Sequence, residues 1–587
     1  MQACTLHAQQ QYARAVAAGQ AALALCPQRA EIHVNLSASL LALGQGERAL
    51  EHADRAIALQ ADLPQAHANR GVILGAMQRT ADAISSFEQA CRLAPEVAAN
   101  WHNLGRAWSE RRAYREALAC FRRVLQLQPD YPFARGAVLS CMQHLCAWGP
   151  EFDALRTMVC EQVRAGAAAC PPFAGLALCD DAALQAQMAR SWVQSQFLAG
   201  ARWTRAAGNA GSAAPRGRIR LGYFSADFHA HATAHLLAGL IAQHQRAEFE
   251  VLLFSYGPRT GDAMQKRLQV CADAFVDLAD LGDAQAVQTV RDYALDIAID
   301  LKGHTQNNRL GWFALGLAPL QLHYLGFPGT VGAGFIDYFL ADRKVVTPEA
   351  AQHFSEKLVY LPDSYQANDD RRAQPAACPA RAQLGLPDEA FVYCCFNNNY
   401  KITPEVFAVW MRILRSVPGS VLWLLQDHAE VAPALRGHAQ AQGVAPQRLV
   451  FAPMVPQSEH LARIAAADLF LDTLPFNAHT NASDALWVGL PVLTCQGESM
   501  AARVAASLLR SLDLDELVTR KLADYEALAV ALAQHADRLQ RVRARLSLQR
   551  ASTRLFQTAR FARQLESAYH QIHQRRLAGL EPATIFL

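Results

Sequence analysis

The chain has 587 residues, of which 52% are hydrophobic, and its formal net charge is +3. This length exceeds what one hydrophobic core can organise, so several domains are expected. The small net charge gives no indication of nucleic-acid binding, and no apolar stretch is long enough to predict a membrane span.

The start of the chain and its cysteines indicate the compartment. Residues 1–16 show no basic segment followed by an apolar core, so no signal peptide is predicted. The 14 cysteines are scattered and show neither paired C-x-x-C spacing nor a disulfide framework. A reduced, cytoplasmic location is expected.

A period of 34 residues runs through the first quarter of the chain. Small residues and prolines recur in step at Ala15, Ala49, Ala83, Ala117, Pro27, Pro95 and Pro129. This is the period of tetratricopeptide repeats, in which two antiparallel helices cross at small residues and stack into a superhelix with a concave groove. Because Met1 falls inside a repeat, we expect the first leading helix to be missing or replaced by a frayed segment over residues 1–12, and the array could extend upstream.

An asparagine recurs in the same register at Asn35, Asn69 and Asn103. A carboxamide offers a donor and an acceptor together, so a ladder of them could hold an extended acceptor peptide by its backbone. In the alternative interpretation, these asparagines only tie neighbouring helices together. Both interpretations stay open at this stage.

Short apolar runs alternate with helical lengths from Ile219 onward. The runs are residues 219–227, 250–256, 296–303, 320–327, 336–342, 391–397, 420–427, 448–453, 469–473 and 491–495. This alternation predicts βαβ units and a mainly parallel sheet in each of two doubly wound, Rossmann-like halves. Ligands of such sheets bind beyond the carboxyl ends of the strands. No G-x-G-x-x-G or P-loop motif is present, so neither a typical dinucleotide site nor a P-loop is predicted.

Changes of composition indicate the domain boundaries. Residues 205–218 are rich in small residues, residues 369–389 in Pro, Ala and charge, and residues 554–576 form an amphipathic helical stretch. The predicted divisions are tetratricopeptide repeats over 1–135, a helical capping or linker region over 136–204, a first Rossmann-like domain over 216–370, a second over 388–552 and a C-terminal helical tail over 553–587.

Residues 475–494 place polar side chains at the start of a predicted helix that ends at Gly489. A helix start presents free N–H groups and partial positive charge, so it can bind an anion. His479 and Thr480 would add donors, and Asp484 could accept from a ribose hydroxyl. The alternative is an ordinary capped helix with a surface histidine. The candidate N-cap residues are Thr480, Asn481 and Ser483.

Residues 394–414 contain a second ligand-facing loop, which lies between a predicted strand and a predicted helix. Asn397, Asn398 and Lys401 follow a strand and precede a helix. A lysine at this place can neutralise a diphosphate leaving group without a metal ion. The alternative is a lysine in a solvated lead-in to the helix.

The first half carries an H-x-H-x-x-x-H pattern after its first strand, in which His231 and His235 could share a helix face. Zinc could bind such a pattern in principle, but no carboxylate or thiolate completes the set. A histidine that acts as general base or hydrogen-bonds the substrate is favoured.

Two further segments bear on sugar and metal binding. Residues 326–334 are glycine-rich, and Gly329 and Thr330 within them offer backbone N–H groups and room for a sugar. The D-x-D at residues 513–515 lies in a charged turn that capping explains, so no metal site is predicted.

Together these segments resemble the O-GlcNAc transferase family of glycosyltransferases, including bacterial homologues and the SPINDLY relatives. The resemblance covers the whole chain and implies a glycosyltransferase type B fold. It further implies an inverting, metal-independent protein O-glycosyltransferase without a cofactor, which moves GlcNAc from UDP-GlcNAc to Ser or Thr of acceptor proteins held by the repeats. The matching segments, in family order, are "SADFHAHATAHL", "APLQLHYLGFPGTVGAGFIDY", "CCFNNNYK", "SVLWLL", "HTNASDALWVGLPVLT" and "RVAASLL".

The resemblance also implies roles for residues at matching positions. His231 matches a cleft histidine proposed as base or acceptor-side contact, and Lys401 matches the lysine that stabilises the departing diphosphate. His479 and Thr480 match a phosphate-binding segment and Asp484 a ribose contact. The remaining nucleotide contacts implied are Asn398 and Asn481 near the phosphates and Val455, Gln457 and His460 near the uracil.

Three residues depart from the family pattern. Asn481 stands where a second threonine is usual, Gln457 replaces a frequent lysine, and Phe476 brings bulk close to the expected sugar pocket. UDP-glucose and GDP-fucose are therefore alternative donors, although the SPINDLY pattern lacks a histidine equivalent to His479, which favours a UDP-sugar. An alternative of another class is a repeat scaffold whose catalytic half is inactive.

Overall fold

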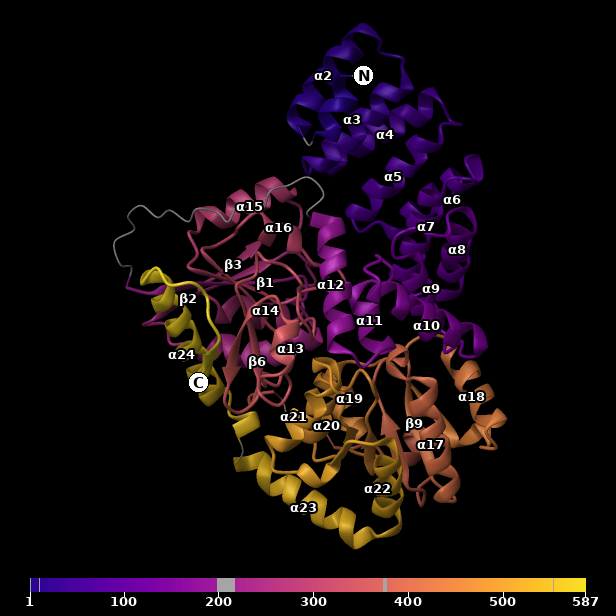
Figure 1. The fold of residues 1–587 in the computed structure, drawn as a ribbon, viewed down its shortest axis with the longest axis vertical. Coiled ribbons are helices and arrows are strands. Elements are labelled where there is room, and N and C mark those ends of the chain that lie inside the picture. The colour runs from indigo at the N-terminus through magenta and orange to yellow at the C-terminus, as the bar shows by residue number, and fades with distance from the viewer. Residues whose placement is uncertain (1, 10, 198–216, 373–376, 553) are drawn as a thin grey trace. The chain divides into compact units, whose positions relative to one another are not determined.

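The computed structural model describes residues 2–9, 11–197, 217–372, 377–552 and 554–587 (Figure 1). The chain divides into two compact units, Met1–Met142 with Leu278–Tyr293 and Gln143–Asp277 with Ala294–Leu587. Most of the linker predicted at 205–218, and part of the linker at 369–389, lie outside the described residues.

The first unit is built from helix pairs, as the 34-residue period predicts. The recurring alanines lie where the helices cross: Ala49, Ala83 and Ala117 are at most 1% exposed. The leading helix of the first pair is present but short, because α1 covers only seven residues. The helices are α1 Gln2–Ala8, α2 Tyr12–Leu25, α3 Ala30–Ala42, α4 Gly46–Leu59, α5 Pro64–Ala76, α6 Thr80–Leu93, α7 Ala98–Glu110, α8 Tyr114–Leu127, α9 Ala134–His144 and α15 Asp283–Asp292.

A parallel sheet of eight strands forms the first half of the second unit, in the order β14-β7-β6-β5-β4-β1-β2-β3. The strand order reverses between β1 and β4, and ligands of doubly wound sheets bind at such a reversal. The strands are β1 Ile219–Ser225, β2 Phe249–Ser255, β3 Ala274–Asp277, β4 Ile297–Asp300, β5 Leu320–His323, β6 Tyr338–Asp342, β7 Lys357–Leu361 and β14 Ile585–Phe586; the helices are α13 Ala232–Gln243, α14 Ala263–Cys271 and α16 Leu310–Ala314.

The second half holds a parallel sheet in the order β10-β9-β8-β11-β12-β13. Here the order reverses between β8 and β11, so the loops after these two strands meet at the carboxyl edge. The elements are β8 Val392–Cys395, α17 Pro404–Ser416, β9 Val421–Gln426, α18 Val431–Ala441, β10 Leu449–Pro453, α19 Gln457–Ile464, β11 Leu469–Leu471, α20 Thr480–Trp487, β12 Val492–Cys495, α21 Val504–Arg510, β13 Val518–Thr519, α22 Leu522–Gln534 and α23 Ala536–Ser552.

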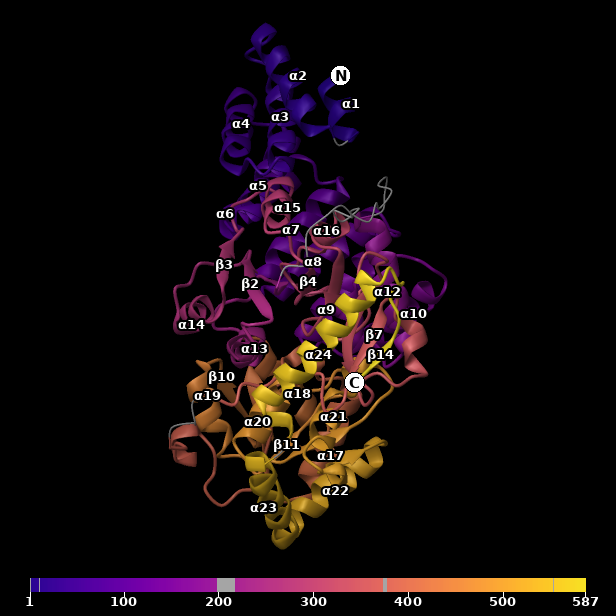
Figure 2. The same cartoon turned by 90° about the vertical axis from the view of Figure 1, so that its left-hand side faces the viewer.

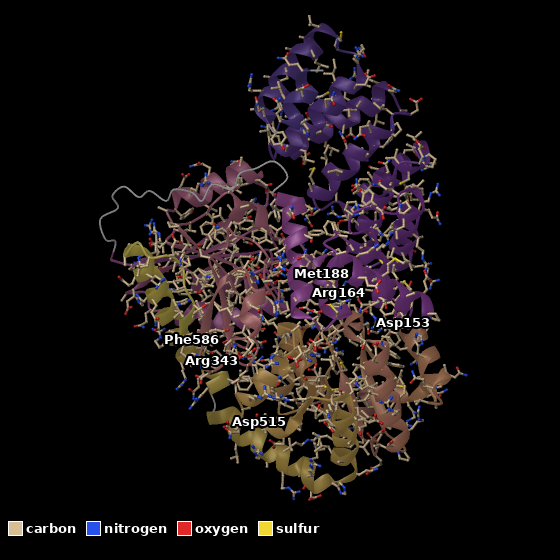
Figure 3. All side chains as sticks on the ribbon, in the orientation of Figure 1. Asp153, Arg164, Met188, Arg343, Asp515 and Phe586 are labelled. Atoms are coloured by element: carbon tan, nitrogen blue, oxygen red, sulfur yellow. The ribbon has the colours of Figure 1, made fainter. Side chains whose placement is uncertain are left out.

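The C-terminal tail returns to the first half. Helix α24 (Thr558–Leu577) lies along the first sheet in Figure 2, and β14 extends that sheet by pairing with β7. Phe586 stacks on Tyr360 and lies under the guanidinium of Arg343, 4.5 Å from the ring centre (Figure 3). The tail predicted as helical therefore consists mainly of α24 and ends in the short strand β14, and it packs against the first half.

The segment between the repeats and the first sheet is helical, as predicted. Its helices are α10 Pro150–Arg164, α11 Pro172–Leu178 and α12 Ala182–Phe197. Among the described residues, no helix is long and apolar enough to cross a membrane.

Candidate active site

Lys401 ends the loop that follows β8, and its side chain is buried rather than solvated. Its Nζ donates to the carbonyl oxygen of Asn477 at 2.9 Å and lies 3.6 Å from the centre of the Phe476 ring. Burial lowers the pKa of Lys401 to about 8, although the nearby Asp472 carboxylate raises it. The alternative, that Lys401 is a solvated lysine leading into the helix, is wrong. The loop instead holds a buried, positively charged side chain at the point where the strand order of the sheet reverses.

Asp472, which no sequence motif indicated, hydrogen-bonds the loop that follows β11 and so supports the loop near Lys401. Its carboxylate accepts from the N–H groups of Thr473 at 2.8 Å and Ala478 at 2.6 Å, and from the hydroxyl of Thr494 at 2.7 Å. Burial raises its pKa to about 6, and these hydrogen bonds and Lys401 oppose the rise. Asp472 thereby fixes the turn between β11 and α20. The sequence feature that could have identified Asp472 as a site residue is its position directly after an apolar strand.

The three asparagines after β8 divide into different roles. Asn397 donates to Thr473 Oγ1 at 2.7 Å, and Asn399 donates to Asp427, so both hold the loop in place. Asn398, the predicted nucleotide contact, is exposed at the start of the turn that contains Lys401.

Helix α20 begins at Thr480, as predicted, and ends before Gly489, whose φ is +85°. The predicted caps are wrong, because His479 occupies the N-cap position and no side chain forms a capping hydrogen bond. The carboxamide of Asn481 instead donates to the Phe396 carbonyl oxygen at 2.8 Å, and Ser483 donates to Asn368. The first turn of the helix therefore keeps N–H groups that no side chain caps, which suits an anion.

His479 is partly covered, so the interpretation as a surface histidine is wrong. Its Nε2 lies 3.3 Å from the carbonyl oxygen of Ala501, and its ring centre is 5.2 Å from that of Phe476. Burial, and then the positive charge of Lys401, hold the pKa of His479 well below its usual value. In the absence of an anion the ring is therefore neutral at neutral pH.

Asp484, one turn into α20, is buried and paired with Arg372. Nη1 of Arg372 donates to Asp484 Oδ1 at 2.9 Å, and Gln457 also hydrogen-bonds this carboxylate. Burial raises the pKa of Asp484, and Arg372 opposes that rise. The structure thus brings together Asp484 and Gln457, two predicted nucleotide contacts. Arg372 was missed because it lies in a stretch that reads as a linker.

The other residues predicted to contact the uracil are Val455, which precedes α19, and His460, which lies within it. The His460 ring packs edge-on against Phe396, with centres 5.1 Å apart, and burial lowers its pKa to about 4. Val455 lines a cavity of about 490 Å³ with Trp423, Phe451 and other side chains, but His460 and Gln457 do not line it.

In the first half, His231 occupies the N-cap of α13, just beyond β1. Its Nδ1 accepts from the N–H of Thr233 at 3.2 Å and lies 3.5 Å from Asp227 Oδ2. The same carboxylate oxygen accepts from Lys302 Nζ at 2.6 Å, and Lys302 follows β4 across the strand reversal. The His231 side chain is 42% exposed; partial desolvation by the surrounding protein lowers its pKa, and the Asp227 carboxylate raises it. Asp227 and Lys302 were not foreseen, although both follow strands that the sequence predicts.

The loop that carries Gly329 and Thr330 is internally hydrogen-bonded. The Thr330 hydroxyl donates to Glu356 Oε2 at 2.6 Å, the Gly329 N–H donates to the Phe327 carbonyl oxygen, and the Val331 N–H donates to Glu356. These groups already have partners in the folded chain. The predicted sugar contact is therefore not favoured here, and the reason is that the loop's donors stabilise the loop itself.

Helix α11 packs against the loops that carry Tyr400 and Phe476. Phe173 contacts both Tyr400 and Phe476, with ring centres 5.9 and 6.1 Å apart. Asp180, just beyond α11, accepts from the N–H groups of Glu498 and Ser499 at 2.8 Å each. The helical segment between the repeats and the first sheet thus packs beside the residues that surround Lys401.

The asparagines of the repeats are half-buried. Asn69 Nδ2 donates to the Val34 carbonyl oxygen at 3.0 Å and to Ser37 Oγ at 3.2 Å, which ties α5 to α3. This contact is the one expected if the asparagines join neighbouring helices. A role of Asn35, Asn69 and Asn103 in peptide binding stays a prediction.

No group of three or more His, Cys, Asp or Glu side chains in the described part of the chain is arranged to hold a metal ion. The H-x-H-x-x-x-H pattern accordingly forms no such group in this structure.

The described residues form helical repeats followed by two parallel-sheet domains, and the second sheet carries a confined cation and a helix start without a side-chain cap at its strand reversal. Residues 205–376 and 372–565 match the family model described as glycosyl transferase family 41, so the chain belongs to this family. Residues 64–97 and 98–131 match tetratricopeptide repeat models.

Named relatives agree with this assignment. The probable UDP-N-acetylglucosamine–peptide N-acetylglucosaminyltransferase SEC of Arabidopsis thaliana is 36% identical over 371 residues, which cover 62% of this chain and 38% of that protein. The similarly named SPINDLY protein of Petunia hybrida is 30% identical over 378 residues, covering 63% and 40%. The chain thus spans about two fifths of the length of these curated relatives.

A solved structure extends the similarity over nearly the whole chain. A mutant of the Thermobaculum terrenum O-GlcNAc transferase superposes with a TM-score of 0.65 and 26% sequence identity, covering 93% of this chain and 97% of that one.

Proposed function

We propose that this protein is an inverting, metal-independent protein O-glycosyltransferase that transfers GlcNAc from UDP-GlcNAc to Ser or Thr hydroxyls of proteins held by the repeats. One observation carries the proposal: the buried ammonium of Lys401 donates to the Asn477 carbonyl oxygen at 2.9 Å, and α20 begins at Thr480 shortly after Asn477 without a side-chain cap. The printed names of the relatives support the donor and the acceptor class. The proposed compartment is the cytoplasm, without nucleic-acid or membrane partners.

The proposed reaction is a single displacement. The acceptor oxygen attacks C1 of the sugar as the bond from C1 to the β-phosphate oxygen breaks, so the configuration inverts and UDP departs. Lys401 and the first N–H groups of α20 stabilise the charge that develops on the β-phosphate. Loss of one such contact typically lowers the rate by roughly 10²–10³. The acceptor proton passes to His231 or to a phosphate oxygen.

Titration calorimetry with UDP tests the proposal against the inactive-scaffold alternative. Micromolar binding that Lys401→Ala and His479→Ala each weaken supports the enzyme, because both side chains border the proposed phosphate site. Lys266→Ala, an exposed position on α14, is the matched control and should bind UDP as the parent protein does. Absence of detectable binding by the parent protein would support the scaffold.

The same reaction with UDP-glucose or GDP-fucose is a second candidate, and the surroundings of Phe476 favour a smaller sugar. Phe476 is 4% exposed and packs among Lys401, His479 and Phe173. One methylene-sized change in a pocket alters preference by only about 1–3 kcal/mol, so a direct competition is needed. Equal concentrations of the three nucleotide sugars in one hydrolysis assay identify the donor.

A further inference from the structure

Arg372 makes an unusual set of contacts for a residue in a connecting segment. Its guanidinium carbon lies 4.3 Å from the centre of the Trp487 ring and 5.6 Å from that of Phe556. Its side chain is 9% exposed, and its one hydrogen-bonded partner in the described part of the chain is Asp484. The guanidinium is thus stacked between rings and aimed at a single carboxylate.

The unused donors of Arg372 distinguish it from an arginine that merely fills a core. Its Nε and Nη2 are buried without a hydrogen-bond partner among the described residues. A buried arginine with a purely structural role normally satisfies most of its five donors, since each unpaired donor costs free energy. In Arg372 two donors stay unpaired, and the guanidinium uses its hydrogen bond to hold one carboxylate in place.

The segment before Arg372 is anchored to the first half of the unit. Arg267 of α14 donates to Asp369 Oδ2 at 2.5 Å, and the Asp370 N–H donates to Thr558 Oγ1 at 2.9 Å. Arg372 therefore extends from the first half to Asp484 in the second half. The carboxylate proposed to contact the ribose is fixed by a residue of the segment that connects the two halves.

We propose that Arg372 is a positioning residue for nucleotide binding, which holds the Asp484 carboxylate ionised and oriented to accept from the ribose hydroxyls of the donor. This inference rests on the proposed function, because it assumes that a nucleotide occupies the second half. Gln457 holds the same carboxylate from α19, so Asp484 is fixed from two sides. Burial raises the pKa of Asp484, and Arg372 is the first charge that opposes the rise.

The test compares UDP with 2′,3′-dideoxy-UDP, a probe that lacks the two hydroxyls. Calorimetry is carried out on the parent protein, Arg372→Gln and Arg372→Lys. We expect the parent protein to bind UDP roughly tenfold or more tightly than the dideoxy probe, since a hydrogen bond to a charged group contributes about 1.5–3 kcal/mol. Arg372→Gln should lower the affinity for UDP and leave the affinity for the dideoxy probe nearly unchanged. Most of the ratio between the two affinities is then lost. Arg372→Lys, which keeps the charge, should retain part of it.

Arg381→Gln is the matched control. Arg381 also lies in the segment between the halves and also forms an ion pair, with Asp468 at 2.8 Å, but it does not contact Asp484. This variant should keep the full ratio. Thermal melting shows whether each variant is folded.

The outcomes separate the inference from the proposed function. An unchanged ratio in Arg372→Gln, or an equal weakening of UDP and the probe, overturns the role of Arg372 while nucleotide binding stands. Failure of the parent protein to bind UDP overturns the proposed function, and the inference with it.

Discussion

At the scale of single residues, the site depends on groups whose charge is set by burial. Lys401 and Asp472 are both buried, and burial brings their pKa values to about 8 and about 6. The sequence suggested Lys401 and His479, because each follows a predicted strand. It did not suggest Asp472 or Arg372, since a carboxylate at a strand end and an arginine in a linker are common and only their contacts distinguish them.

The pKa of Lys401 gives a pH prediction. The ammonium form stabilises the departing diphosphate, so kcat/KM for the donor should fall as pH rises through about 8, where the free protein loses that charge. Lys401→Arg should remove this decline, because a guanidinium stays protonated. Steady-state rates between about pH 6 and 10 provide the measurement. A parent profile that is flat or rising across this range would contradict the assigned role.

The hydrogen bonds of His231 bear on which group accepts the proton. Its Nδ1 accepts from the Thr233 N–H at 3.2 Å, which favours the neutral ring with its proton on Nε2, a form in which Nε2 donates to a substrate and does not accept a proton from it. We therefore expect His231→Ala to raise KM for donor or acceptor and largely to keep kcat. A fall in kcat of roughly 10²–10⁴ with unchanged KM would identify a general base instead.

At the scale of elements, small residues set how closely the repeat helices approach. The 34-residue period predicted the helix pairs because tight crossings tolerate few residue types. By contrast, β3, β7, β13 and β14 were not foreseen. They are short, between two and five residues, and each contains at least one residue that is not buried.

Two glycines of α5 provide a matched test of this packing. A Cβ on Gly71 would lie 2.5 Å from the Phe87 ring, whereas one on Gly75 meets nothing within 4 Å. Gly71→Ala should lower the free energy of unfolding by about 1–3 kcal/mol through overpacking. Gly75→Ala should raise it by about 0.5–1 kcal/mol through helix propensity. Hydrogen exchange over residues 64–97 measures both changes. Equal effects would show that the crossing is not tight.

At the scale of the whole molecule, distant segments complete the first half. Glu566 of α24 accepts from the Gln245 N–H at 2.8 Å and pairs with His244 Nδ1 at 3.1 Å. The alternation of strands and helices predicted two parallel sheets, but it carried no information about where the tail would dock. That docking depends on partners more than 300 residues apart.

Removal of the Glu566 carboxylate should destabilise this half. Glu566→Ala removes the acceptor of the buried His244 and of two partly buried donors of Gln245, so we expect a loss on the order of 3 kcal/mol in the free energy of unfolding. Glu581→Ala, at an exposed position of the same tail, is the control and should melt as the parent protein does. Identical melting of the two variants would show that the tail does not stabilise the sheet.

The most direct test of the central claim is sugar transfer from UDP-GlcNAc to proteins by the parent chain and by Lys401→Ala. The claim is that a buried cation at the reversal point of the second sheet drives departure of the nucleotide. The account predicts transfer by the parent chain and a rate lower by roughly 10²–10³ in the variant, with the fold retained. Transfer by Lys401→Ala at the parent rate would contradict it.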